Sequence, residues 1–165
     1  MKIKDVTSDD LFKLAEIENK IFGVNSFGVY VLNEYLEKDT TLYFQKILNE
    51  KNEIIGFFIV SKLNKENYED ILPKSLSNIN FDEYAHLDNI VLKEEYQNKG
   101  IGSYILKYLI DLLKKRGLFK IILEVSTENA KAIKLYTKNN FKNINFIKNY
   151  YNSGENAFIM IYEEK

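Results

Sequence analysis

The chain has 165 residues, of which 45% are hydrophobic and 14% aromatic, and its formal net charge is -1. This length suits one domain with a sizeable core, and the composition argues against a disordered chain. The balanced charge gives no overall basic surface for nucleic acid, and the absence of cysteine excludes disulfides, thiolate nucleophiles and cysteine-ligated zinc. We expect a single domain over residues 1–165 that binds neither nucleic acid nor metal.

The N-terminal part of the chain predicts a short strand followed by two helices. Ile3 and Val6 mark the strand, and the polar run at residues 7–10 supplies N-cap residues for a helix that stops at Gly23. Apolar residues at helical spacings predict a second helix over residues 29–36. The N-terminus lacks an apolar signal core, and no run approaches the roughly 18 apolar residues that span a membrane. The sequence therefore predicts a cytoplasmic protein with no membrane partner.

The next segment predicts an antiparallel pair of strands and a long polar excursion. Strands are expected over residues 41–48 and 54–60, joined by a polar turn. Residues 63–84, here called the excursion, are too long for an ordinary connection, and a short helix is expected at 68–72. The excursion is either a substrate-facing loop or a surface insertion. The acidic residues in it that could meet a cation are Asp70, Asp82 and Glu83.

A glycine-spaced turn connects the following strand to a helix. The strand, over residues 86–92, leads into Gln97-Asn98-Lys99-Gly100-Ile101-Gly102, and an amphipathic helix follows from Ser103 and ends at Gly117. The first turn of a helix has free backbone N–H groups and the positive end of the helix dipole, so it binds phosphate well. The two glycines lack the Cβ atoms that would keep a pyrophosphate from the backbone.

This turn matches neither of the two common phosphate-binding motifs. The sequence has no Walker loop, and Ile105 stands where a dinucleotide-binding fingerprint would have its third glycine. Because Gly-x-Gly also occurs in plain strand-to-helix turns, a purely structural turn stays open as an alternative on these residues alone.

The C-terminal part predicts a strand, a helix and two further strands. Residues 120–126 alternate as a strand in which Glu124 shares a face with Ile122 and Ser126. A helix is expected over residues 129–138, and the last two strands over 141–147 and 157–162. Glu124 is therefore a carboxylate inside a mostly apolar strand.

Several of these segments together resemble a known family. The residues that carry the resemblance are Gln97-x-x-Gly100-x-Gly102, Leu123-Glu124-Val125, Asn129-x-x-Ala132-Ile133-x-Leu135-Tyr136 and Asn149-Tyr150-Tyr151. Their order and spacing resemble the GNAT family of acetyl-CoA-dependent N-acetyltransferases, and within it the RimI-type ribosomal-protein-alanine acetyltransferases. The resemblance covers roughly residues 85–162. It implies an α/β fold with a mixed, mostly antiparallel central sheet that is splayed in the middle and flanked by helices.

The resemblance also implies where acetyl-CoA, the co-substrate, would bind. The backbone of the strand before the turn would hold the pantetheine arm, the turn would hold the pyrophosphate, and the next helix would contribute one side chain. The residues implied are Ile90, Val91, Leu92, Gln97, Asn98, Lys99, Gly100, Ile101, Gly102, Ser103 and Asn129. Asn140 stands where the family often has glycine, and asparagine tolerates the left-handed conformation that glycine serves.

Amide formation from a thioester needs a base and an acid. The amine arrives as an ammonium ion and must lose a proton, and burial of Glu124 would raise its pKa toward neutrality. Tyr136 follows Asn129 by about two helical turns and could protonate the departing thiolate. The resemblance assigns Glu124 as general base and Tyr136 as general acid; a solvated glutamate and a core tyrosine are the structural alternatives. His86, the only histidine, is expected to be structural.

The sequence leaves the acceptor open between two classes of amine. The expected reaction is acetyl transfer to a protein N-terminal amine, perhaps on a ribosomal protein. The alternative is a small amine such as a polyamine, for which the acidic excursion would form an attractive wall. A non-catalytic acyl-CoA-binding module is a third reading, which the presence of both Glu124 and Tyr136 disfavours. Tyr150 and Tyr151 could shape a pocket for a peptide terminus or fill a strand connection, and the sequence sets no oligomeric state.

Overall fold

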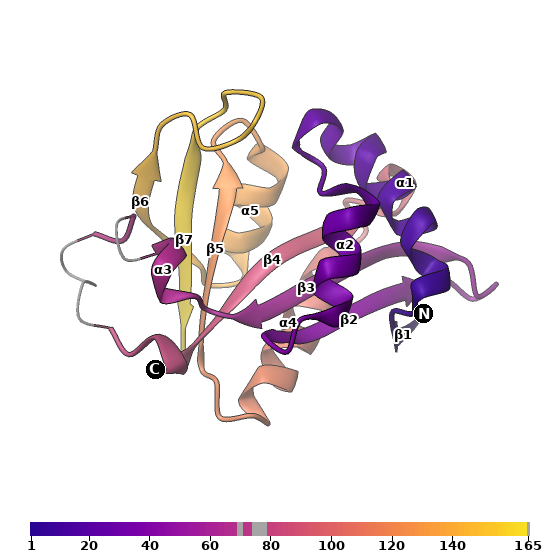
Figure 1. Cartoon of the computed structure of the whole chain (residues 1–165), viewed down its shortest axis with the longest axis horizontal. Coiled ribbons are helices and arrows are strands. Elements are labelled where there is room, and N and C mark those ends of the chain that lie inside the picture. The colour runs from indigo at the N-terminus through magenta and orange to yellow at the C-terminus, as the bar shows by residue number, and fades with distance from the viewer. Residues whose placement is uncertain (69–70, 74–78, 165) are drawn as a thin grey trace. The chain divides into compact units, whose positions relative to one another are not determined.

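The computed structural model describes residues 1–68, 71–73 and 79–164. Within these residues the predicted α/β class is confirmed by a mixed, mostly antiparallel sheet with the strand order β1-β2-β3-β4-β5-β7-β6 (Figure 1). The strands are β1 (Lys2–Asp5), β2 (Thr41–Leu48), β3 (Ile54–Lys62), β4 (Tyr84–Leu92), β5 (Lys120–Ser126), β6 (Lys142–Ile147) and β7 (Ala157–Glu163). The helices are α1 (Leu11–Phe22), α2 (Gly28–Glu37), α3 (Lys65–Tyr68), α4 (Ile101–Lys114) and α5 (Ala130–Lys138). In the described part of the chain, no helix has the length and apolar character needed to cross a membrane.

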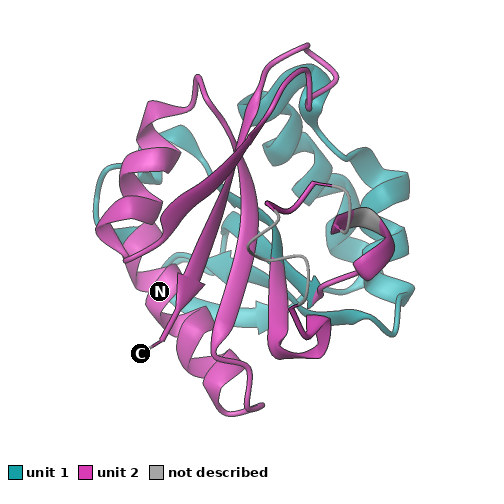
Figure 2. Cartoon of the chain, turned by 90° about the vertical axis from the view of Figure 1, so that its left-hand side faces the viewer, with its two compact units in different colours: residues 1–61, 87–101 teal, residues 62–86, 102–165 magenta. Residues whose placement is uncertain are grey.

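The chain divides into two compact units, which Figure 2 colours separately. The first unit comprises residues 1–61 and 87–101, and the second comprises residues 62–86 and 102–165. The division falls inside β4, directly after His86. The expectation of one domain over residues 1–165 stays a prediction.

In the first unit, α1 and α2 pack on strands β2, β3 and the end of β4. Both helices are amphipathic, and their apolar faces meet apolar side chains of the sheet in one buried cluster. The cluster contains Val6, Leu11, Leu14, Ile17, Leu32, Phe44, Phe57, Ile59 and Val91. As predicted, α1 ends at Gly23, whose φ of 54° is the left-handed conformation that glycine adopts without strain.

Gly56 lets β3 approach β4 closely within the first unit. A Cβ atom on Gly56 would lie 2.1 Å from the carbonyl oxygen of Val91 and 2.9 Å from the Leu92 side chain. The backbone of β4 cannot yield to that contact without distortion, so this position requires glycine. Gly56 thereby fixes the end of β4 from which the glycine-spaced turn departs.

In the second unit, β5, β7 and β6 form an antiparallel set. β7 pairs with β5 from Lys120 opposite Glu163 to Ser126 opposite Ala157. β4 pairs with β5 in parallel through Tyr84, Ala85 and His86 only. A sheet that opens after these residues would have such a short parallel pairing. The opening itself stays a prediction.

Helices α4 and α5 form close to their predicted positions. The buried residues of α4 are Ile105, Leu106, Leu109, Ile110 and Leu113, which form one helical stripe. The apolar spacing predicts a stripe of Ile101, Ile105, Leu109 and Leu112; Ile105 and Leu109 belong to the observed stripe, whereas Ile101 and Leu112 are only partly buried. After α5, Asn140 has a φ of 68°, the left-handed conformation expected of it.

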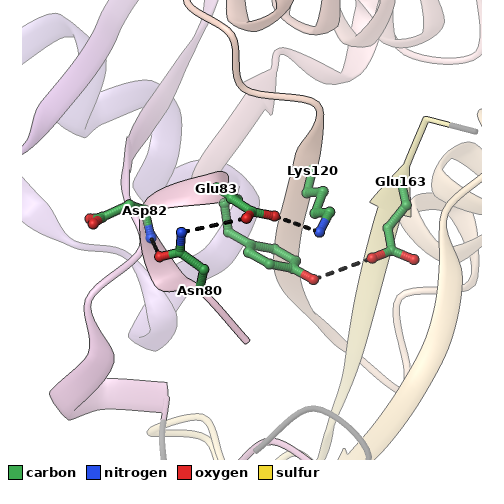
Figure 3. A network of polar contacts seen from close by, with 6 residues as sticks. Asn80, Asp82, Glu83, Lys120 and Glu163 are labelled. Carbon is green, nitrogen blue, oxygen red and sulfur yellow. Dashed lines mark hydrogen bonds and ion pairs between the residues drawn. The ribbon is translucent and has the colours of Figure 1, made fainter. Parts of the chain in front are cut away.

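The excursion belongs to the second unit, where its ends are tied to the sheet. A helix was expected at 68–72; α3 is described over Lys65–Tyr68, and residues 69–70 of the expected helix lie outside the described residues. Figure 3 shows the C-terminal end of the excursion, where Glu83 accepts a 2.8 Å hydrogen bond from Lys120. Of the acidic residues expected to meet a cation, Glu83 is thus already paired with a lysine, and Asp70 lies outside the described residues.

Candidate active site

The turn after β4 has the backbone conformation of an anion-binding loop. Asn98 and Gly100 have φ values of 57° and 81°, and alternation of such left-handed residues with ordinary ones turns successive N–H groups toward one point. α4 begins at Ile101, directly after Gly100 and earlier than the predicted Ser103. Lys99 places its ammonium group 5.9 Å from the centre of the Tyr96 ring, within the same turn. These features suit a pyrophosphate.

Gln97 holds the turn against the end of β4. Its Nε2 atom donates a 2.9 Å hydrogen bond to the carbonyl oxygen of Leu92. The next residue, Lys93, donates its backbone N–H to the Ile55 carbonyl at 2.9 Å. Gln97 therefore has a structural partner, Leu92. Leu92 is also one of the three residues, with Ile90 and Val91, that were expected to bind the pantetheine arm.

Gly102 has a reason for being glycine that differs from the expected one. A Cβ atom on Gly102 would lie 3.1 and 3.3 Å from the two methyl carbons of Leu135 on α5, whereas one on Gly100 would meet nothing within 4 Å. Gly102 thus permits close packing of α4 on α5, and Gly100 permits a positive φ. Ser103, also expected at the turn, accepts a 3.2 Å hydrogen bond from Nδ2 of Asn139.

Asn129 is the N-cap of α5. Its Oδ1 atom accepts a 3.0 Å hydrogen bond from the backbone N–H of Ala132, which satisfies one of the free donors of the first turn. The side-chain oxygen is therefore committed to the helix, and the amide NH₂ is the group through which Asn129 could bind acetyl-CoA.

Glu124 is the centre of a cluster of polar side chains in the second unit. Its side chain is 8% exposed, and its Oε2 atom lies 3.0 Å from Nε2 of His86. The Tyr68 hydroxyl donates a hydrogen bond to Oε1 of the same carboxylate. Tyr150 donates a further hydrogen bond to it. The carboxylate predicted as general base is buried and surrounded by hydrogen-bond donors.

Burial raises the pKa of Glu124 to about 7, while the hydrogen bonds from its own backbone and from Tyr150 act in the opposite direction. At neutral pH such a group exists in both protonation states, so it can accept a proton and release it again. That property suits a general base better than the low pKa of an exposed glutamate.

Two other tyrosines face this cluster. Tyr136 is 6% exposed and packs its ring 5.5 Å from that of Phe141. Burial raises the pKa of Tyr136, and the charges of Tyr151 and Glu124 raise it further, so its hydroxyl keeps its proton. Burial likewise raises the pKa of Tyr151, with added contributions from Glu124 and Glu155.

The predicted catalytic pair, Glu124 and Tyr136, interacts within the second unit with the two tyrosines of the β6–β7 connection. Glu124, Tyr136, Tyr150 and Tyr151 share the second unit, together with Gly102, Ser103 and Asn129. The remaining acetyl-CoA residues expected, 90–92 and 97–101, belong to the first unit. Sequence reasoning missed Tyr68 and expected His86 to be structural, yet both contact Glu124.

The chain thus has a buried carboxylate with a pKa near neutrality. It also has a strand, a turn and a helix suited to a phosphate group. Both features are expected of an acyl-transfer enzyme. The chain belongs to the acetyltransferase (GNAT) family, whose model matches residues 9–141. It is an N-acetyltransferase of that family, which uses acetyl-CoA, and the expected resemblance is confirmed.

Individual relatives are similar over nearly the whole chain. The N-alpha-acetyltransferase of Saccharolobus solfataricus is 28% identical over 161 residues, which cover 96% of this chain and 90% of that protein. The ribosomal protein bS18-alanine N-acetyltransferase of Haemophilus influenzae is 31% identical over 163 residues and covers 96% of this chain and 95% of its own. The crystal structure of the ribosomal-protein-S18-alanine N-acetyltransferase from Escherichia coli has a TM-score of 0.74 and 25% identity, covering 98% of this chain and 92% of that chain.

Proposed function

We propose that this N-acetyltransferase moves the acetyl group of acetyl-CoA to the α-amino group of a protein N-terminus, with Glu124 as the general base. The observation that carries the proposal is the burial of Glu124, which raises its pKa to about 7. An α-ammonium group has a pKa of about 8, so transfer of its proton to Glu124 is only slightly unfavourable. For a lysine-like amine, with a pKa of about 10.4, the same transfer would be about 3 kcal/mol less favourable than for an α-ammonium group.

The proposed reaction is a direct attack. Glu124 takes one proton from the ammonium group, and the free amine attacks the thioester carbonyl. The attack forms the carbon–nitrogen bond and leaves a tetrahedral intermediate whose nitrogen carries one surplus proton. As the carbon–sulfur bond breaks, the Tyr136 hydroxyl passes its proton to the departing sulfur, the surplus proton of the nitrogen restores Tyr136, and Glu124 releases its own proton to solvent. Tyr136 remains protonated at neutral pH, which this role requires.

For acetyl-CoA, we propose that the turn at residues 98–103 binds the pyrophosphate and that residues 90–92 hydrogen-bond the pantetheine arm. Gln97 supports the turn through its hydrogen bond to Leu92, and Asn129 offers its amide NH₂. The positive φ values at Asn98 and Gly100 support this assignment.

The acceptor proposed is an N-terminal alanine, as on a ribosomal protein, in the cytoplasm. It is supported by the two relatives that are named as alanine N-acetyltransferases of a ribosomal protein, bS18 or S18. The connection between β6 and β7 supplies Tyr150, which is 41% exposed and hydrogen-bonded to Glu124, and could thus contact both an acceptor and the base.

Mass spectrometry after incubation with acetyl-CoA tests the acceptor. Three acceptors would be compared: a peptide that begins with alanine, the same peptide with a blocked N-terminus and an internal lysine, and spermidine. We expect one acetyl group on the first and none on the other two. Acetylation of spermidine alone would overturn the proposal in favour of the small-amine alternative.

A further inference from the structure

The described apolar residues of the excursion pack into the core of the second unit. The backbone N–H of Leu63 donates a 3.3 Å hydrogen bond to the Tyr84 carbonyl, which ties its two ends together. Its described apolar residues join one buried cluster with strands β5 and β7. The members of that cluster are Leu63, Tyr68, Leu72, Tyr84, Ile122, Ile159 and Ile161. Ile122 shares a strand face with Glu124, so the excursion covers the face that carries this carboxylate.

Tyr68 is the residue of the excursion that reaches Glu124. Its hydroxyl donates to Oε1, while His86 lies at Oε2, so the two carboxylate oxygens have separate partners. The rings of Tyr68 and His86 pack edge to face, with centroids 5.2 Å apart. Tyr68 is only 4% exposed, so burial and the packing on His86 hold its ring in place beside Glu124.

The hydroxyl of Tyr68 donates to Glu124 and should favour the ionised carboxylate. The titratable groups that face this carboxylate are His86 from β4, Tyr68 from α3, Tyr136 from α5, and Tyr150 and Tyr151 from the connection between β6 and β7. A phenol that donates to a carboxylate stabilises the ionised form, which is the form that a general base needs. Removal of one such donor must shift Glu124 toward its protonated form.

We propose that the excursion supplies Tyr68 as a positioning residue for acetyl transfer: its hydroxyl holds the Glu124 carboxylate in place and favours its ionised state. This inference rests on the proposed role of Glu124 as general base. If Tyr68 has this role, the excursion serves the reaction and is not merely a tolerated surface insertion.

The test compares Tyr68→Phe with wild type in the pH dependence of kcat/KM for an alanine-initiated peptide. The variant keeps the ring that packs on His86 and loses only the donor. We expect the acid limb of the profile to move up by about one pH unit, with kcat/KM about tenfold lower on that limb and similar to wild type well above it.

Tyr84→Phe is the matched control. Tyr84 lies in the same cluster, and its hydroxyl donates to Glu163 at 3.2 Å rather than to Glu124. The acid limb of its pH profile of kcat/KM should coincide with that of wild type. Thermal unfolding of both variants separates loss of stability, which lowers the rate at every pH, from the limb shift.

An acid limb in Tyr68→Phe that coincides with that of wild type would overturn the inference. Glu124→Gln, assayed in parallel, keeps the two claims apart. Full turnover by Glu124→Gln would remove the base assignment itself. Loss of turnover in Glu124→Gln together with an unmoved limb in Tyr68→Phe would contradict only the role of Tyr68.

Discussion

The Nε2 atom of His86 lies 3.0 Å from Oε2 of Glu124. The contact follows from the pairing of β4 with β5, because His86 stands opposite Ile122, and Ile122 and Glu124 are on the same face of β5. The only histidine of the chain is therefore next to the carboxylate that we propose as the base.

If this contact supports Glu124, the role depends on a hydrogen-bonding group at position 86. We expect His86→Leu to lower kcat/KM at pH 7 by about tenfold, because it leaves one carboxylate oxygen without its partner. His86→Gln keeps an N–H donor and should retain most of the rate. Steady-state kinetics on the alanine-initiated peptide measures both, and equal losses in the two variants would show that the hydrogen bond is not what matters.

Gln97 should act on acetyl-CoA binding and not on the chemical step. Gln97→Ala removes the hydrogen bond to the Leu92 carbonyl, so the turn loses one attachment to β4. We expect the KM for acetyl-CoA to rise about threefold to tenfold with kcat little changed. Gln45→Ala, which removes a 2.8 Å hydrogen bond to Asp5 elsewhere in the first unit, is the control and should leave KM unaltered. A fall in kcat alone would contradict the assignment.

The stability cost of replacing Gly102 by alanine should depend on Leu135, whereas the cost of replacing Gly100 should not. Gly102→Ala places a methyl group against Leu135, so it should be better tolerated by at least about 0.5 kcal/mol when Leu135 is also changed to Ala. Gly100→Ala meets no side chain and is strained by its positive φ at a cost of about 1–2 kcal/mol. Its cost should be the same in both backgrounds. Chemical denaturation of the single and double variants measures the coupling, and an equal coupling for both glycines would count against this explanation.

The sequence was informative where local patterns decide the structure. Strands 41–48 and 120–126 were predicted with the observed bounds, since alternation and flanking polar residues define them locally. The sequence placed Glu124 in a mostly apolar strand but left its burial open, and the structure shows its side chain to be 8% exposed.

What escaped prediction depends on contacts between distant segments. Tyr68 and His86 reach Glu124 from other elements, and neither periodicity nor spacing reports which side chains the fold brings together. The lone histidine at the start of the strand that pairs with β5 was the available signal, but its meaning needed the register of β4 on β5. Likewise, the reason for Gly102 lies in Leu135 on another helix.

Glu18 is a buried carboxylate of α1 that accepts hydrogen bonds from the start of α2 and from β4. It is 0% exposed and accepts hydrogen bonds from Asn89 at 2.6 Å and from the backbone N–H of Gly28 at 3.3 Å. Glu18→Ala leaves these donors without an acceptor and should lower the free energy of unfolding by about 2–3 kcal/mol, whereas Glu18→Gln keeps an acceptor and should cost less.

The charge state of Glu18 is tested by the pH dependence of the free energy of unfolding in wild type and in Glu18→Gln. Burial raises the pKa of Glu18 above its ordinary value of 4.5, against the opposing hydrogen bonds. A raised folded-state pKa means that stability is fully present below the unfolded value and is lost as the pH rises through the folded one. Wild type should therefore lose stability relative to Glu18→Gln as the pH rises above about 4.5. Parallel unfolding curves at every pH would contradict this assignment.

The most direct test of the account is the pH dependence of kcat/KM for an alanine-initiated peptide in wild type and Glu124→Gln. The pKa of about 7 predicts that the wild-type rate rises through neutrality as Glu124 ionises. Glu124→Gln should lower kcat/KM by about 100-fold or more and flatten that rise, with the Kd for acetyl-CoA nearly unchanged. Wild-type turnover in Glu124→Gln, with the rise near pH 7 intact, would show that another group is the base.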